Sequence, residues 1–288
     1  MPSNPPLRFG NVLYQTDARV ATITLNRPQR FNAIDAEMPG NIAAAFEHAG
    51  RDDSVHVIVL RGAGRGFCGG YDLNLFAAQT GGDNPVAQEM PWDAMIDYRF
   101  ISRCTQDFMS IWRCPKPVIA RVHGDAVAGG SDIALCCDIV VMSNKARIGY
   151  PPARVWGCPT TAMWVYRLGA ERAKQLLFSG DLISGKRAAK IGLIFKATPL
   201  SKLDHAVAAL TERIQGVPKN QLMMMKLLVN QAYENMGLAN TQTIATLFDG
   251  LARHSPEGVH FKRRAQQSGF KQAIAERDSG APIGGGKK

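Results

Sequence analysis

The stretch KPVIARVHGDAVAGGSDIALCCDIVV, residues 116–141, decides the fold class of this chain. Its opening part, PVIARV, is rich in β-branched residues and predicts a strand. The adjacent glycines Gly129 and Gly130 begin a predicted helix that runs to about Cys137, and IVVM at 139–142 predicts the next strand. A strand, a helix and a strand in this order indicate an α/β fold with crossover connections.

The same alternation precedes this stretch. The segments VATITLN at 20–26 and VHVIVL at 55–60 predict two earlier strands, and residues 36–49 carry helical spacing between them. Residues 74–102 break the pattern, and we interpret them as a mobile loop that leads into a helix, with Trp92 as its anchor. This rhythm predicts one α/β core over residues 1–200.

The strand patterns end at Ser201, which is a plausible N-cap for the first of several helices. We therefore expect a C-terminal helical region over residues 201–288. Its last residues, APIGGGKK, lack the apolar content to pack, and we expect a disordered tail there. The helices are expected at residues 201–215, 219–235, 241–254 and 256–277.

Composition narrows the class of protein. Of the 288 residues, 45% are hydrophobic and 20% are charged, which is typical of a globular chain and excludes a disordered one. The apolar stretches are far shorter than the roughly 20 residues of a membrane span, and no signal sequence is evident, so we expect a cytoplasmic protein without membrane attachment. The six cysteines form no CxxC pair, which favours free thiols and no metal.

The formal charge of +10 would attract an acidic partner: nucleic acid, anionic lipid or a phosphorylated small molecule. Nucleic-acid binding is the less favoured of these, because the Lys and Arg residues are scattered and form no continuous stripe with aromatic residues. Neither a GxxxxGK[ST] loop nor a GxGxxG turn between a strand and a helix occurs. The sequence therefore lacks the motifs that would indicate an ATP-dependent or NAD-dependent enzyme.

Two glycine-rich turns are the candidate sites for chemistry in this sequence: GFCGGYDL at 66–73 and GDAVAGGSDI at 124–133. Glycine allows the backbone to approach a ligand closely, and an amide at a helix N-terminus has no intrahelical partner. Two such turns side by side would offer two N–H donors to one developing oxyanion. The alternative interpretation is that both are tight strand–helix connections.

The chain resembles the crotonase family of enoyl-CoA hydratases and isomerases from about residue 20 to 195. The resemblance rests on five motifs in order: RPQRFNAID, RGFCGGYDL, the stretch at 116–141, GCPTT, and RLGAERAKQLLFSGDLISGKRAAKIGLI. It implies a ββα spiral core and a C-terminal helical region that often mediates trimers, commonly paired as hexamers. It also implies an acyl-CoA thioester as substrate, with coenzyme A as part of that substrate and no separate cofactor.

The resemblance assigns catalytic roles to three residues. The backbone amides of Tyr71 and Gly129 would hold the thioester oxygen, and Asp132 occupies the position where family hydratases carry a glutamate. An aspartate in a first helical turn could instead simply complement the helix dipole. As a base, Asp132 would be ionised at neutral pH if it kept a model-peptide pKa of about 3.9.

The second acid of the family is missing from its usual segment. That segment reads GYPPARVWG here, so Pro152 or Ala153 stands where hydratases place a glutamate, and Thr160 and Thr161 stand where some relatives use an aspartate. Any second acid must therefore come from elsewhere. One of the acidic residues of the 74–102 loop could fold over the site and supply it, although solubility of the loop is the favoured explanation for each of them: Asp83, Glu89, Asp93 and Asp97.

A further set of residues would bind the acyl chain and CoA if the resemblance holds. The aromatic members could equally have packing roles, and the basic group around Lys262 could be a solvated helix face. The set is Arg30, Phe31, Asn32, Ala33, Cys68, Gly70, Asp72, Tyr150, Arg154, Trp156, Phe248 and Lys262.

Three functions thus compete. The first is an enoyl-CoA hydratase or double-bond isomerase that uses Asp132 beside an oxyanion hole. The second is an acyl-CoA binder of low or altered activity, because the second acid is missing. The third is an RNA-binding relative of the family.

Overall fold

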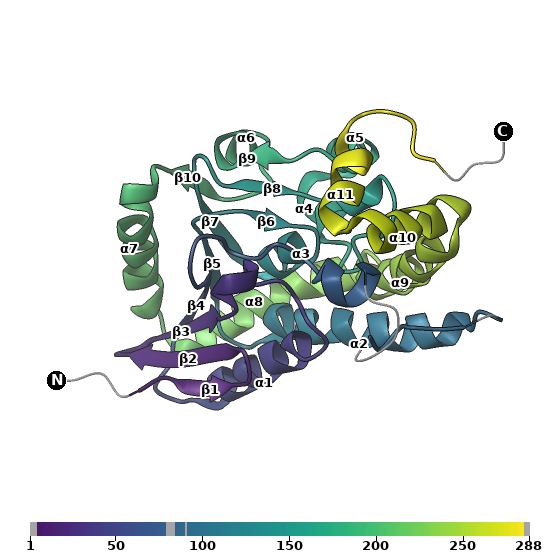
Figure 1. The fold of residues 1–288 in the computed structure, drawn as a ribbon. Coiled ribbons are helices and arrows are strands. Elements are labelled where there is room, and N and C mark those ends of the chain that lie inside the picture. The colour runs from purple at the N-terminus through teal and green to yellow at the C-terminus, as the bar shows by residue number, and fades with distance from the viewer. Residues whose placement is uncertain (1–4, 79–83, 90, 285–288) are drawn as a thin grey trace.

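The computed structural model describes residues 5–78, 84–89 and 91–284. Its centre is a seven-stranded sheet with the order β1-β2-β3-β4-β5-β7-β10 (Figure 1). The first three strands are antiparallel and the rest run parallel. The strands are β1 (Leu7–Phe9), β2 (Val12–Asp17), β3 (Val20–Leu25), β4 (Val57–Gly62), β5 (Val118–Val122), β7 (Ile139–Ser143) and β10 (Lys196–Thr198).

A second sheet of three short strands lies beside the first, in the order β6-β8-β9. The chain passes from a strand of the large sheet to a strand of the small sheet, then through a helix, and repeats this path. The order β5, β6, α3 and the order β7, β8, α4 are two such turns. This is the ββα spiral that the resemblance implied. The small strands are β6 (Ala126–Val127), β8 (Arg147–Gly149) and β9 (Ile183–Ser184).

The large sheet is apolar on both faces because helices cover both. Val57 and Val59 of β4 pack with Leu203 and Val207 of α7, whereas Ile58 belongs to the main core on the other face. A strand buried on two sides reads as a continuous apolar run, which explains the segment VIVL. The helices are α1 (Met38–Arg51), α2 (Ala94–Arg113), α3 (Gly129–Cys136), α4 (Met163–Leu168), α5 (Ala170–Ser179), α6 (Gly185–Lys190), α7 (Leu203–Gln215), α8 (Lys219–Asn235), α9 (Leu238–His254), α10 (Pro256–Ser268) and α11 (Phe270–Asp278).

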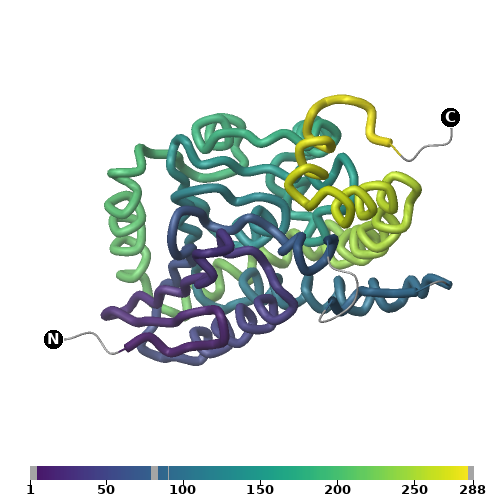
Figure 2. The backbone as a smooth tube through the Cα atoms, in the orientation of Figure 1, coloured from purple at the N-terminus to yellow at the C-terminus, as the bar shows by residue number. Residues whose placement is uncertain are grey.

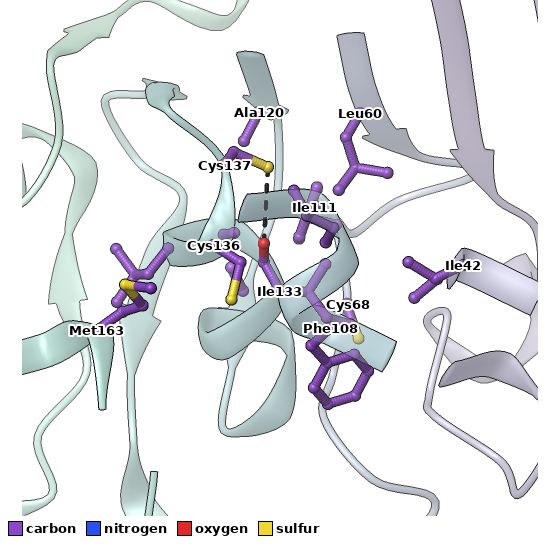
Figure 3. Packing of buried hydrophobic residues seen from close by; sticks show 14 of the residues in the cluster. Ile42, Leu60, Cys68, Phe108, Ile111, Ala120, Ile133, Cys136, Cys137 and Met163 are labelled. Atoms are coloured by element: carbon purple, nitrogen blue, oxygen red, sulfur yellow. Dashed lines mark hydrogen bonds between the residues drawn. The ribbon is translucent and has the colours of Figure 1, made fainter. Parts of the chain in front are cut away.

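The main core encloses α3 almost completely. Figure 3 shows Ile133 and Cys136 of this helix, and its C-cap Cys137, among the large apolar side chains around them. All six cysteines are free and five of them are buried, so the prediction of free thiols is confirmed. A helix held on every side gives the residues at its N-terminus fixed positions.

The C-terminal helices return across the α/β core. Helix α9 packs on α2, and α10 and α11 then lie over the short π-helix η2 (Asn74–Ala78). Figures 1 and 2 show the yellow end of the chain at the opposite end of the molecule from the green helix α7. Every helix among the described residues is too short or too polar to cross a bilayer.

Three details of the sequence analysis need correction. Ser201 lies inside the 3-10 turn η4 (Leu200–Lys202), so α7 starts at Leu203 without a side-chain cap. The helix expected over 256–277 is two helices, because Gly269 has a φ of 80° between them.

In the tail that was expected to be disordered, Ile283 packs against the cluster around Trp156 and Phe261, and residues 285–288 lie outside the described part.

Candidate active site

The two glycine-rich turns are joined by backbone hydrogen bonds. The amides of Phe67 and Cys68 both donate to the carbonyl of Asp125, at 3.1 and 3.0 Å, and the amide of Val127 donates to the carbonyl of Cys68 at 3.0 Å. A Cβ atom at Gly130 would lie 2.2 Å from the Cys68 carbonyl oxygen. Only glycine permits this approach, which brings Tyr71 and Gly129 together.

The amides of Tyr71 and Gly129 have no hydrogen-bond acceptor within the described residues. Gly129 is the first residue of α3, where an amide lacks an intrahelical partner. Both chain neighbours of Tyr71 are hydrogen-bonded to Ile34. The amide of Ile34 donates to the Gly70 carbonyl at 2.8 Å, and the amide of Asp72 donates to the Ile34 carbonyl at 2.9 Å. This pairing holds the Tyr71 amide free.

The backbone around these amides is strained. Ala128, the N-cap of α3, has φ 52° and ψ −125°, a region that non-glycine residues rarely occupy. Phe31, Asn32 and Trp156 also have positive φ angles, of 52°, 54° and 90°. Strain of this kind gathers at sites where the surrounding structure imposes a functional geometry.

A cavity of about 210 Å³ opens beside the two turns, and we call it the main cavity. Its wall is largely apolar and aromatic, with residues from the turns, from the segment at 150–157 and from helices α9 and α11. The lining residues are Gly69, Tyr71, Leu73, Phe76, Val127, Ala128, Tyr150, Pro151, Pro152, Trp156, Gly157, Leu182, Asp249, Arg253, Ile274, Arg277 and Asp278.

Asp132 lies one helical turn below Gly129 and is 2% exposed. Its Oδ1 accepts a hydrogen bond from Thr161 Oγ1 at 2.7 Å. Burial raises the pKa of Asp132 to about 8, the Thr161 hydroxyl opposes this shift, and the charge of Asp249 adds to it. Asp132 therefore does not keep the model-peptide pKa, and a pKa of about 8 favours the neutral carboxyl at pH 7, which suits a proton donor.

The segment Arg30 to Ala33 forms a rigid turn beside the first glycine-rich turn. Asn32 is buried, and its side chain donates to the carbonyls of Gly66 and Phe67 at 3.0 and 3.1 Å. Phe31 is exposed, with the guanidinium of Arg65 over its ring. The Ala33 amide donates to the Arg30 carbonyl at 3.0 Å, and the Arg30 amide donates to the Arg27 carbonyl at 2.9 Å. The Ala33 carbonyl accepts from the guanidinium of Arg27.

Phe31 and Arg65 line a second, open cleft of about 620 Å³. Arg65 and Lys145 bring two basic side chains to this cleft from different segments. His123 lines it too, and burial lowers the pKa of its imidazole. Gly69 donates to the carbonyl of Phe31 at 2.9 Å, so the turn that carries Phe31 also contacts the wall of the main cavity.

Three residues near the first turn have structural contacts. The thiol of Cys68 is buried and donates to the carbonyl of Asn32 at 3.1 Å. Asp72 forms an ion pair with Arg27 at 3.2 Å. Gly70 has a φ of 88°, and a Cβ there would lie 2.8 Å from the Val127 carbonyl, so a side chain would force the turns apart.

Tyr150 and Trp156 line the main cavity, and the hydroxyl of Tyr150 donates to the Cys158 carbonyl at 2.7 Å. Arg154 is not in this lining. Its guanidinium pairs with Asp181 at 3.2 Å and with Asp278 at 3.0 Å, which ties α11 to the core.

The two C-terminal residues lie apart from the main cavity. Phe248 is 54% exposed on α9, and Lys262 lines a smaller cleft together with Trp92. The anchoring role predicted for Trp92 is confirmed, since its indole donates to Asp97 at 2.8 Å and stacks on His254.

The acidic residues of the 74–102 segment are absent from the lining given above. Asp83 lies outside the described residues. Asp93 accepts from the amide of Met95 and caps α2, Asp97 is buried against Trp92, and Glu89 lines the smaller cleft. Among the described residues, no group of His, Cys, Asp or Glu is arranged to hold a metal ion.

Sequence analysis missed Asp249, which lines the main cavity and is 4% exposed. Its Oδ1 accepts from the Cys158 amide at 2.9 Å, and its Oδ2 accepts from Arg253 at 2.7 Å. The sequence feature that could have pointed to Asp249 is its spacing from Arg253, four residues later on the same predicted helix. Such a pair usually lies on a solvated face, and the sequence gives no sign that this one is buried.

Two unpaired amides beside a mostly apolar cavity, with buried carboxylates nearby, have the features of a candidate enzyme site. The comparison with known families agrees: the family described as enoyl-CoA hydratase/isomerase matches residues 15–272. The chain belongs to this family. It is an acyl-CoA-processing enzyme, and the resemblance drawn from its motifs is confirmed.

Individual relatives cover most of the chain. A crystal structure of enoyl-CoA hydratase from Mycobacterium smegmatis is 44% identical, with a TM-score of 0.88 over 95% of this chain and 96% of that one. An enoyl-CoA hydratase/isomerase from Xanthobacter autotrophicus is 29% identical, with a TM-score of 0.85 over 96% and 100%. The 1,2-epoxyphenylacetyl-CoA isomerase of Escherichia coli is 30% identical over 78% of this chain and 83% of its own length.

Proposed function

We propose that this enzyme hydrates an enoyl-CoA or moves its double bond, and that the amides of Tyr71 and Gly129 hold the thioester oxygen. The observation that carries the proposal is the pair of amides without acceptors on two turns fixed against each other. Donors fixed before the reaction stabilise an enolate oxygen without reorganisation, and each contributes about 3 kcal/mol.

The main cavity would hold the acyl chain. It lies against Tyr71, and its aromatic and aliphatic wall suits an apolar chain. The open cleft beside Phe31 would bind the nucleotide end of CoA, because Arg65 and Lys145 offer positive charge to phosphates and Phe31 offers a ring surface to adenine. Coenzyme A would thus arrive as part of the substrate, and no separate cofactor is proposed.

The test of this function is turnover of a panel of enoyl-CoA thioesters. Hydration of a 2-enoyl-CoA removes the absorbance of the conjugated thioester, and isomerisation of a 3-enoyl-CoA creates it. We expect the wild-type enzyme to change one of these signals, and calorimetry to show binding of the saturated analogue. Binding without turnover across the panel would instead favour the acyl-CoA binder.

We propose a homotrimer or a hexamer as the functional assembly. Helices α8 and α9 carry ten exposed apolar side chains, and contacts between chains would bury part of this apolar surface. We call these residues the α8–α9 face: Met223, Met224, Met225, Leu227, Leu228, Val229, Ile244, Leu247, Phe248 and Leu251.

Light scattering at micromolar concentration should give a mass of three or six chains of 31.3 kDa. Leu228 is 66% exposed on this face, so Leu228→Glu should leave the fold intact and shift the mass toward one chain, because a charge would be buried at the contact. A wild-type mass of one chain would contradict the assembly.

We also propose the cytoplasm as its location. The free state of all six cysteines supports this, since cytosolic proteins keep their thiols reduced.

A further inference from the structure

We propose that Asp249 of α9 is the proton-accepting carboxylate of this enzyme, held in place by Arg253. The inference rests on the proposed function and gives it the second carboxylate that the usual segment lacks. Pro151 and Pro152 line the main cavity where that segment passes, and neither can transfer a proton. Asp249 enters the same cavity from the C-terminal helices instead.

The absence of a side chain at Gly157 leaves room for the carboxylate of Asp249. A Cβ at Gly157 would lie 2.8 Å from Asp249 Oδ1, so a side chain at that position would cover or displace the acid. The Tyr150 hydroxyl would be 3.8 Å from the same Cβ. Asp249 therefore lies against the segment that contains Pro151 and Pro152, and Gly157 keeps its carboxylate uncovered.

The hydrogen bonds of Asp249 fit an ionised carboxylate. One oxygen accepts from the Cys158 amide and the other from Arg253, and both partners can only donate. Burial raises the pKa of Asp249, whereas the charge of Arg253 and these two hydrogen bonds oppose the shift. The side chain of Arg253 is 11% exposed, and its Nε finds no acceptor among the described residues.

The other carboxylates near the cavity suit this role less well. Asp278 also lines it, but its oxygens are bound by Arg277 and Arg154, and its side chain is 31% exposed. Asp132 is absent from the lining and is the protonated partner. The environments of the two carboxylates differ, since Asp249 accepts from an amide and a guanidinium and Asp132 accepts from one hydroxyl. Such a difference in environment is what separates a base from an acid.

The proton transfer balances without any co-reactant. Asp249 takes a proton from C2 of the bound thioester, and the C–H electron pair becomes the enolate, whose oxygen lies between the amides of Tyr71 and Gly129. Return of the proton to C2 restores the substrate, and return to C4 of the conjugated dienolate moves the double bond. The carboxylate is regenerated in either case.

The direct test is exchange of the C2 hydrogens of butyryl-CoA in D₂O, followed by proton NMR. This reaction needs only the base and the oxyanion donors. Asp249→Asn should slow the exchange by about 10²-fold or more, with the Kd for butyryl-CoA within about threefold of the wild type. Asp249→Ala should be equally slow, and added formate should restore at least part of the exchange, because it can occupy the vacated position.

Asp138 offers a matched control on another part of the molecule. It accepts from the Val118 amide at 2.7 Å and from Lys226 at 2.8 Å, so it has the same type of partners as Asp249, and it lines a different cavity. Asp138→Asn should lower the Tm as Asp249→Asn does and leave the exchange rate within about twofold. Formate should not affect Asp138→Ala.

Four outcomes would overturn the assignment. Exchange at the wild-type rate in Asp249→Asn would show that the base lies elsewhere, and so would failure of formate to restore any rate to Asp249→Ala. Parallel losses in the Asp249 and Asp138 variants that follow their Tm would show a purely structural role. A wild type that binds butyryl-CoA but neither exchanges its hydrogens nor turns over any enoyl-CoA would overturn the proposed function as well.

Discussion

Replacement of Gly129 by proline is expected to abolish turnover in a protein that still folds. The substitution removes the N–H that would hold the thioester oxygen, and one such donor is worth about 10²- to 10³-fold in kcat. Proline is tolerated at the first position of a helix, and the Gly129 amide makes no backbone bond that could be lost. The loss should therefore appear in kcat, measured by the absorbance assay.

Gly129→Ala provides the matched control for this prediction. Its Cβ would lie 2.8 Å from Ile34 Cδ1 and 3.0 Å from Tyr71 Cε2, so alanine shares the crowding of proline but keeps the donor. The difference in kcat between the two variants isolates the amide. Undiminished activity in folded Gly129→Pro, checked by circular dichroism, would show that this N–H does not bind the oxyanion.

The fold was predictable where a segment is long enough to show a period. The strands β4 and β5 and the helix α8 were expected within a few residues of their bounds, because their apolar patterns extend over five or more positions. The strands β6 and β9 have two residues each, which is too short for any alternation. These strands pair with β8 because successive turns of the ββα spiral bring them together in the small sheet.

The site was predictable only in its contiguous parts. The glycine-rich turn that carries Gly129 and Asp132 is one motif, so the sequence places the donor and the acid a helical turn apart. The pKa of Asp132 depends on burial, and the side chains that bury it come from distant segments such as the one that carries Thr161. Asp249 lies 91 residues from its partner Cys158, and no local pattern connects them.

Replacement of Asp132 by asparagine should lower kcat by about 10²-fold or more. Asparagine keeps the shape of the side chain and can still accept from Thr161, but it cannot transfer a proton. The kcat of enoyl-CoA turnover and the exchange of C2 hydrogens should respond differently. If Asp132 donates and Asp249 accepts, the exchange in butyryl-CoA should fall less than hydration, because exchange does not need a second acid.

The pH profile of the wild type shows whether Asp132 acts as an acid or as a base. With a pKa of about 8, the carboxyl is neutral below that pH and ionised above it, so kcat/KM should fall as pH rises through 8 if Asp132 acts as an acid. Four ionisable groups face Asp132: the carboxyl of Asp249, the thiol of Cys136 and the phenols of Tyr71 and Tyr150. Burial raises the pKa of the thiol and of both phenols well above their ordinary values, which already lie above 8. The alkaline limb can therefore be assigned to Asp132, and it should disappear in Asp132→Asn. A wild-type profile that rises through pH 8, with the rise lost in Asp132→Asn, would instead make Asp132 the base. An unchanged limb in Asp132→Asn would assign the titration to another group.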